Sequence, residues 1–288
     1  MTLVQNLGRF MPPVFKRKLA KYLHQRSLKK ILSLECDGTP LRSIDDLAAR
    51  ALFADHDNDP GWDDVSNRIA LFDIPDGTGG VNPGDRRALF YLIRALRPAS
   101  TLEIGTHIGA STLHIASALF ANGPIVGGAK KQLVSVDVVD VNDRISRPWE
   151  KFATRYSPAE MLQTMGLDSI VEFIVKPSLE YFAACERKFD VIFLDGDHAA
   201  ATVYREIPAA LRVLNQEGVI VLHDYFPNLK PLWVDGSVVP GPFLATERYR
   251  CAGAQVVVLP LGDLPWPTKL NSNTTSLALL LRDSGVRG

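Results

Sequence analysis

The sequence predicts an α/β protein, a doubly wound and mostly parallel sheet of seven strands with an antiparallel C-terminal hairpin and an N-terminal helical extension. From Asp85 onward, short apolar segments alternate with amphipathic ones, which is the pattern of strands covered by helices on both faces. The first apolar segment runs into a turn that contains Gly105 and Gly109. The last two apolar segments are joined by a Pro-rich linker without helical pattern, so these strands must pair antiparallel or nearly so.

The part of the chain before the sheet divides into a basic segment and a loop-rich one. Residues 9–30 contain eight Lys or Arg residues and no acid, with apolar residues at helical spacing. We expect a helix that packs on the main domain; the alternatives are a homodimer contact and an anchor on an anionic surface. Residues 36–83 mix acids, prolines and glycines, which predicts a short helix near 43–53 and then loops. We therefore expect an extension of helices and loops over 1–82.

The sheet domain is expected over residues 83–288, and each of its elements follows from apolar spacing and from the residues that end it. The helix over 85–97 stops at Pro98, which cannot continue a helix. The other expected helices lie near 110–121, 158–166, 178–187, 198–214 and 242–252. The expected strands cover 100–105, 133–137, 171–175, 190–195, 218–222, 256–259 and 275–281.

The composition narrows the class of protein. The chain has 288 residues, 46% hydrophobic content and no formal net charge, which is typical of a soluble globular protein and argues against a broad nucleic-acid surface. No apolar run is long enough to span a membrane, and the N-terminus lacks the pattern of a signal peptide, so no integral membrane segment is expected. The three cysteines lie far apart, which is typical of reduced thiols in a cytoplasmic protein.

The turn after the first strand predicts a pocket for a nucleotide-like ligand. Glycine lets the backbone approach a ligand closely, and the N–H groups of the following helix can take a carboxylate. The spacing E-x-G-x-x-x-G, which begins at Glu103, differs from the G-x-G-x-x-G of dinucleotide-binding proteins. Glu103 can hold an ammonium group, directly or through water, and Thr106, Ser111 and Thr112 are candidate hydrogen-bond neighbours.

Polar residues also follow the other central strands, at the sheet edge where doubly wound proteins bind ligands. Asp137 can accept both hydroxyls of a ribose, and Ser178 can border an adenine. Asp195-Gly-Asp197-His198 and His223-Asp224 follow two further strands, and clusters of Asp and His are typical of metal sites. The structural alternatives are a helix cap for Asp197 or His198 and a neutral, hydrogen-bonded imidazole for His223.

Four segments, LEIGTHIGAST, VSVDVVD, FDVIFLDGDH and GVIVLHDY, occur in this order along the chain. Residues 98–224 thereby resemble the class I S-adenosylmethionine (SAM) dependent methyltransferases related to catechol O-methyltransferase and to bacterial natural-product sugar O-methyltransferases. The resemblance implies a Rossmann-like fold that binds SAM through a set of residues at the strand ends, namely Glu103, Gly105, Thr106, Gly109, Ser111, Thr112, Asp137, Ser178 and Asp195.

The resemblance also implies a divalent cation. In that family the cation is held by an Asp after the fourth strand and by two acidic or amide residues after the fifth, which correspond to Asp195, His223 and Asp224. His223 stands where relatives carry a carboxylate. Because Mg²⁺ prefers oxygen ligands whereas imidazole suits Mn²⁺ and other borderline ions, both the identity and the presence of the metal stay open.

The general base of the family lies two or three positions after the Asp of the fourth strand, which corresponds to Asp197 or His198. We prefer His198, because a neutral imidazole accepts a proton near pH 7. The sequence therefore predicts an enzyme that transfers a methyl group from SAM to a small molecule, at oxygen, with residues 226–253 covering the active site.

Three alternatives stay open at this point. The first is a metal-independent N- or O-methyltransferase on the same fold. The second is an NAD(P)-dependent oxidoreductase, which the missing G-x-G-x-x-G and the terminal strand pair disfavour. The third is a SAM-binding protein without catalytic activity.

Overall fold

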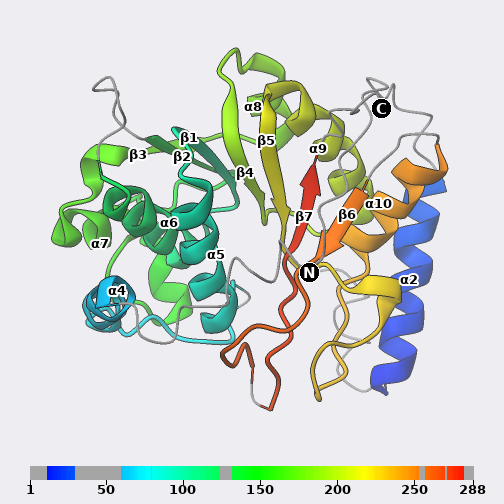
Figure 1. Cartoon of the computed structure of the whole chain (residues 1–288). Coiled ribbons are helices and arrows are strands. Elements are labelled where there is room, and N and C mark those ends of the chain that lie inside the picture. The colour runs from blue at the N-terminus through cyan, green and yellow to red at the C-terminus, as the bar shows by residue number, and fades with distance from the viewer. Residues whose placement is uncertain are drawn as a thin grey trace.

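The computed structural model describes residues 12–29, 60–78, 80–123, 132–252, 257–269 and 271–281. Within them, seven strands form one sheet in the order β3-β2-β1-β4-β5-β7-β6 (Figure 1). The strands are β1 (Ser100–Ile104), β2 (Gln132–Asp137), β3 (Val171–Val175), β4 (Phe189–Leu194), β5 (Leu214–Leu222), β6 (Val257–Pro260) and β7 (Ala278–Leu281). The first five pair parallel, and β7 pairs antiparallel with both β5 and β6. The predicted fold class is confirmed.

Helices cover both faces of this sheet (Figure 1). One face carries α4 (Pro60–Ala70), α5 (Pro83–Leu96), α6 (Ala110–Ala121) and α7 (Pro158–Met165); the other carries α2 (Pro13–Lys29), α8 (Ser178–Ala184), α9 (Ala200–Val213) and α10 (Gly241–Cys251). Short 3₁₀ turns lie at η2 (Pro148–Phe152), η3 (Asp168–Ile170) and η4 (Pro227–Leu229). Successive residues of β4 join opposite cores, because side chains alternate along a strand: Val191 and Phe193 pack under α5 and α6, whereas Ile192 and Leu194 pack under α9.

The carboxyl ends of the central strands are held in register, which fixes where the functional residues lie. The N–H of Gly105 donates to the carbonyl of Val136 (2.8 Å), and the N–H of Asp195 donates to that of Ile104 (2.9 Å). The N–H of His223 likewise donates to the carbonyl of Leu194 (3.2 Å). The residues that follow β1, β4 and β5 are therefore neighbours at one edge of the sheet, where the strand order reverses.

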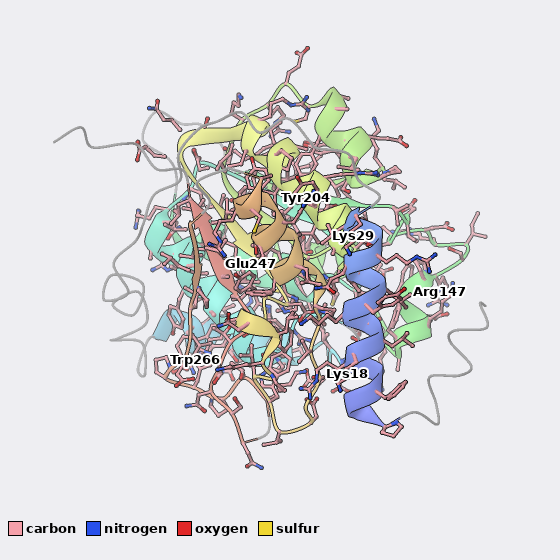
Figure 2. All side chains as sticks on the ribbon, turned by 90° about the vertical axis from the view of Figure 1, so that its right-hand side faces the viewer. Lys18, Lys29, Arg147, Tyr204, Glu247 and Trp266 are labelled. Atoms are coloured by element: carbon pink, nitrogen blue, oxygen red, sulfur yellow. The ribbon has the colours of Figure 1, made fainter. Side chains whose placement is uncertain are left out.

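The basic N-terminal helix packs on the main domain, as the favoured interpretation of its sequence predicts. Helix α2 lies against α9 and α10, and Figure 2 shows Lys29 at the end of α2 that lies near Tyr204 of α9. Leu28 is buried in this contact. The homodimer contact and the surface anchor stay predictions, and the helix expected near 43–53 lies outside the described residues.

The segment after residue 53, expected to be loops, contains the helix α4, so that part of the prediction is wrong. Pro60 fills the first helical position, where its missing N–H is no loss, and Asp63 lies in the first turn. Trp62, Val65 and Ile69 form an apolar stripe at helical spacing and pack against the core. The Asp-Pro-Gly run that indicated a turn is thus also the start of a helix. Among the described helices, none combines the length and apolarity that a membrane crossing requires.

Candidate functional site

The turn after β1 brings its backbone very close to the end of β4. Gly105 and Gly109 have φ angles of 98° and 78°, in the left-handed region that favours glycine. A Cβ added to Gly105 would lie 2.2 Å from the carbonyl oxygen of Asp195, and one added to Gly109 would lie 2.7 Å from Cβ of Pro158. Both glycines are therefore required by the close packing of this turn, and α6 begins directly after it.

A cavity of about 430 Å³ opens at the carboxyl ends of β1, β2 and β4. Four of the predicted cofactor residues line it, namely Gly105, Asp137, Ser178 and Asp195. His107, Lys176, Asp197 and Glu206 are polar residues that complete its wall. The cavity thus lies at the switch point of the sheet, where doubly wound proteins bind their ligands.

The carboxylate of Asp137 is fixed at the wall of this cavity. Its Oδ2 accepts hydrogen bonds from the N–H groups of Thr106 and His107, each at 3.0 Å, and its Oδ1 accepts one from the N–H of Val139 at 2.9 Å. A carboxylate offers about four acceptor positions, so capacity for a ligand hydroxyl remains. At the opposite wall, Ser178 donates to Oε1 of Glu206 at 2.5 Å. Burial raises the pKa of Glu206 to about 7.

Glu103 is fully buried and does not line the cavity. Its carboxylate accepts hydrogen bonds of 2.6 Å from the hydroxyls of Ser111, Thr112 and Ser135. Burial raises the pKa of Glu103 to about 7, although the three hydroxyls work against that rise. The structure therefore brings Glu103, Ser111 and Thr112 together in the interior, between β1 and α6. Their hydrogen bonds tie the strand to the helix that follows the turn.

Substituting Glu103 with glutamine is expected to flatten the pH dependence of stability. The pKa of Glu103 is raised above its ordinary value of 4.5, so its stabilising contribution is complete below about pH 4.5 and is lost as the pH rises through about 7. One such proton changes the free energy of unfolding by about 1.4 kcal/mol per pH unit. Urea unfolding at pH 5 and pH 8 measures this, and the wild type should lose more free energy over the interval than Glu103→Gln. Equal losses would show that Glu103 does not titrate there.

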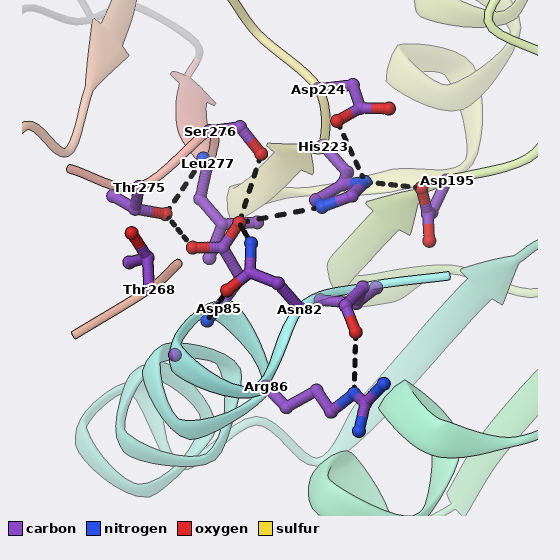
Figure 3. Close-up of polar contacts among 12 residues, drawn as sticks. Asn82, Asp85, Arg86, Asp195, His223, Asp224, Thr268, Thr275, Ser276 and Leu277 are labelled. Carbon is purple, nitrogen blue, oxygen red and sulfur yellow. Dashed lines mark hydrogen bonds and ion pairs between the residues drawn. The ribbon is translucent and has the colours of Figure 1, made fainter. Parts of the chain in front are cut away.

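The ends of β4 and β5 bring four predicted residues together beside this cavity. His223 Nδ1 lies 2.7 Å from Oδ1 of Asp195 (Figure 3). His198 Nε2 lies 3.2 Å from Oδ2 of Asp224 and 3.6 Å from Oδ1 of Asp195. The two imidazoles and two carboxylates thus face one another, as the sequence predicts for strand ends at a switch point.

The surroundings of the buried His223 ring favour its protonated form. Burial by itself lowers the pKa of His223, but the charges of Asp195 and Asp224 and contacts with Asp195 and Asp85 outweigh it, and the pKa lies well above its ordinary value. The Nδ1–H therefore donates to Asp195.

The donors of this cluster are spaced as a metal site requires. One ligand atom from each of Asp195, His198 and His223 lies within 4.8 Å of the others. The contacts among the four side chains run from 2.7 Å to 3.8 Å. For comparison, adjacent ligands of a six-coordinate ion with bonds of about 2.1 Å lie about 3 Å apart. An imidazole donor beside carboxylates suits a borderline transition ion better than Mg²⁺.

Asp197 faces the start of α9. Its Oδ1 accepts from the N–H of Ala199 at 2.9 Å, and its Oδ2 accepts from the hydroxyl of Thr202 at 2.6 Å. Both oxygens are therefore engaged just before and at the first turn of α9, although the N-cap of this helix is Ala199 and no side chain caps it. His198 is the member of the pair whose side chain reaches the Asp195–Asp224 cluster.

A second cavity of about 930 Å³ opens beside His223 and Asp224. Phe226, Trp233 and other residues between positions 226 and 253 form one side of it. Trp233 is held in place because its Nε1–H donates to the carbonyl of Thr274 at 3.1 Å and its ring meets Phe226 edge-on at 5.2 Å. Asp195 lines the first cavity and His223 and Asp224 line the second, so the cluster lies on the walls of both cavities.

Sequence reasoning missed Asp85, which faces His223, and Glu206, which lines the first cavity. Asp85 is fully buried at the start of α5, and its Oδ2 lies 3.6 Å from Nε2 of His223 (Figure 3). An acid in the first turn of a helix is also the ordinary complement of the helix dipole, so the sequence carried no signal that sets Asp85 apart.

Comparison with known proteins agrees with this geometry. Residues 102–225 match the sequence model of a family described as a methyltransferase domain. A putative O-methyltransferase from Klebsiella pneumoniae is 22% identical, with a TM-score of 0.50 over 80% of this chain and 93% of that one. The O-methyltransferase TomG from Streptomyces achromogenes, involved in tomaymycin synthesis and crystallised with SAM, is 18% identical, with a TM-score of 0.50 over 84% of this chain and 100% of that one. At such identities these structures show the shared fold.

Proposed function

We propose that this chain, whose residues 102–225 match a family described as a methyltransferase domain, transfers the methyl group of SAM to a hydroxyl oxygen of a small molecule. One observation carries the proposal: a cavity at the switch point and a larger cavity meet at a single cluster of carboxylates and imidazoles. The first cavity would take SAM and the second the acceptor. The names of the structural neighbours, both O-methyltransferases, agree with transfer to oxygen.

The walls of the smaller cavity match the parts of SAM. The Gly105 turn lines this cavity and would take the methionine end, whose carboxylate would lie near the N-terminus of α6, which follows directly after the turn. Asp137 accepts the ribose hydroxyls, and Ser178 borders the adenine. Glu103 acts on the cofactor through the turn that it supports rather than by direct contact.

The substitution Asp137→Asn is expected to weaken SAM binding about 10-fold to 100-fold, since a hydrogen bond to a charged group contributes about 1.5–3 kcal/mol. Isothermal titration with SAM measures the change. Asp140→Asn is the matched control, because Asp140 lies in the same loop, accepts from the N–H of Asn142 and is absent from the cavity wall. Equal weakening in both variants would contradict a specific ribose contact.

The acceptor loses its proton at the cluster between the cavities. Asp195, His223 and Asp224 would hold a divalent cation, which supplies Lewis acidity that favours ionisation of the acceptor hydroxyl. His223 must give up its Nδ1 proton when the cation binds. His198 Nε2 takes the hydroxyl proton, and Asp224 and Asp195, at 3.2 Å and 3.6 Å, stabilise the imidazolium that forms.

The transfer itself forms a bond between the acceptor oxygen and the methyl carbon as the carbon–sulfur bond breaks, and the sulfur leaves as a neutral thioether. The protein's main contribution is to hold the two reactants in line and in contact. Residues 226–253, with Trp233 and Phe226 on the wall of the larger cavity, cover the acceptor and exclude water.

Methyl-labelled SAM tests this function. The protein is incubated with a panel of small phenols, sugars, amines and carboxylic acids, with Mn²⁺ or with a chelator. We expect label on a hydroxyl-bearing compound and a strong loss of transfer with the chelator. Label on amines alone would contradict transfer to oxygen, and transfer that survives the chelator would contradict the role of the cation. Thermal stabilisation by NADPH rather than S-adenosylhomocysteine would favour an oxidoreductase.

A further inference from the structure

We infer that Asp85 is a positioning residue, which fixes His223 with Nδ1 turned toward the cation site and thereby supports cation binding from outside the ligand set. The inference rests on the proposed function, because it concerns the cation that Asp195, His223 and Asp224 would hold.

Asp85 is in contact with three neutral hydrogen-bond donors, and the ring of His223 is a basic group that faces it. The side chain is fully buried. Its Oδ1 accepts from the hydroxyl of Thr275 at 2.5 Å, and its Oδ2 accepts from Nδ2 of Asn82 at 2.7 Å and from the hydroxyl of Ser276 at 3.0 Å (Figure 3). All three groups are neutral donors. A buried carboxylate is stable when a donor of positive charge completes its shell, and Nε2 of His223, 3.6 Å away, is placed to do so.

Among the described residues, the ring of His223 has an N–H position that lacks a hydrogen-bond acceptor. Its Nε2 is buried and has no hydrogen bond within the described part of the chain, and it points toward Asp85. The backbone of His223 is tied to β4 through the bond from its N–H to the carbonyl of Leu194. The ring is held at Nδ1 by the 2.7 Å contact with Asp195, and Asp85 faces the opposite nitrogen and favours a proton there.

A proton held at Nε2 determines what the opposite nitrogen can do. Histidine ligands of metals usually donate their other ring N–H to a carboxylate or carbonyl, which fixes the tautomer and the ring orientation. With Nε2–H on Asp85, the lone pair of Nδ1 is directed at the edge where Asp195 lies 2.7 Å away. Asp85 thus accounts for the orientation in which His223 offers Nδ1 to the cluster.

Binding of Mn²⁺ alone, measured by titration calorimetry, tests the inference in a way that does not depend on activity. Asp85→Asn should weaken Mn²⁺ binding about 10-fold to 100-fold, the usual effect of losing such a partner. SAM affinity should stay within about twofold, because Asp85 is absent from the wall of the cofactor cavity. Ser276→Ala is the matched control: it removes one hydrogen bond from Asp85 and keeps the carboxylate, so Mn²⁺ affinity should change less than about threefold.

The result that overturns the inference is Mn²⁺ affinity in Asp85→Asn equal to that of the wild type. If that variant does not fold, ¹⁵N-histidine spectra of the wild type decide, with the signal of His223 assigned from a His223→Asn sample. Addition of the diamagnetic ion Zn²⁺ should shift Nδ1 and leave the proton on Nε2, and coordination through Nε2 would overturn the inference. If the wild type binds SAM but no divalent ion, the cation site and this inference are wrong, whereas the proposal of methyl transfer is unaffected. If the wild type binds neither, the proposed function is wrong as well.

Discussion

Replacing Gly105 with alanine is expected to reduce SAM affinity by more than about 100-fold. The added Cβ would lie 2.2 Å from the carbonyl oxygen and 2.7 Å from the carbonyl carbon of Asp195, and neither backbone atom can yield as a flexible side chain would. The φ angle of 98° adds backbone strain of about 1–2 kcal/mol for any residue with a Cβ. The turn or the end of β4 must therefore move, and both form the wall of the cofactor cavity. Titration calorimetry with SAM measures the loss.

The control for this variant is Gly166→Ala. Gly166 has a φ angle of 70° and no atom within 4 Å of an added Cβ, so the substitution introduces the strain without the collision. We expect a loss of about 1–2 kcal/mol in the free energy of unfolding and no change in SAM affinity. Unchanged SAM affinity in Gly105→Ala would mean that the cofactor does not lie over this turn.

Asp195→Asn is expected to lower kcat by about 100-fold to 1,000-fold, the usual effect of removing one group that stabilises charge in the transition state. Asp195 lines the cofactor cavity, accepts the hydrogen bond from His223 and lies 3.6 Å from His198. The same carboxylate is therefore expected to contact the methyl donor, bind the cation and stabilise the protonated base. Asparagine keeps the shape of the Asp195 side chain and removes its negative charge. Mn²⁺ affinity should fall together with kcat.

The comparison with Asp197→Asn separates the two carboxylates of this loop. Because Asp197 uses both oxygens at the start of α9, we expect a lower thermal midpoint and a loss of less than about tenfold in kcat. A loss in Asp197→Asn as large as that in Asp195→Asn would assign the base to Asp197 in place of His198.

Local pattern was sufficient to predict most of the sheet. The strand at 171–175 and the helix at 110–121 have the bounds that apolar spacing predicts, because neither depends on distant contacts for its type. The meeting of Asp195, His198, His223 and Asp224 was predictable for a related reason. Parallel strands with short connections place their carboxyl ends at one edge, so residues that follow β4 and β5 become neighbours.

The direction of Glu103 could have been predicted and was not. Side chains alternate along a strand, and the apolar neighbours Leu102 and Ile104 belong to the core under α9. Glu103 therefore points to the opposite face, toward Ser111 and Thr112 of α6, and not out of the strand end.

The role of Asp85 could be recognised only from the three-dimensional structure. Two of its partners, Thr275 and Ser276, lie 190 and 191 residues further along the chain, and they reach it because β7 inserts beside β5. No local pattern reports such a contact. The helix α4 was missed for another reason, since Pro and Asp serve both turns and helix starts and only burial of its apolar stripe decides between them.

A crystal structure of the protein with S-adenosylhomocysteine and Mn²⁺, with anomalous scattering to locate the ion, tests the central claim most directly. We predict the nucleoside in the cavity beside Gly105 with its ribose on Asp137, the sulfur facing Asp195, and a manganese peak at Asp195, His223 and Asp224. A nucleoside bound elsewhere, or manganese absent from this cluster while the ligand occupies the cavity, would contradict the account.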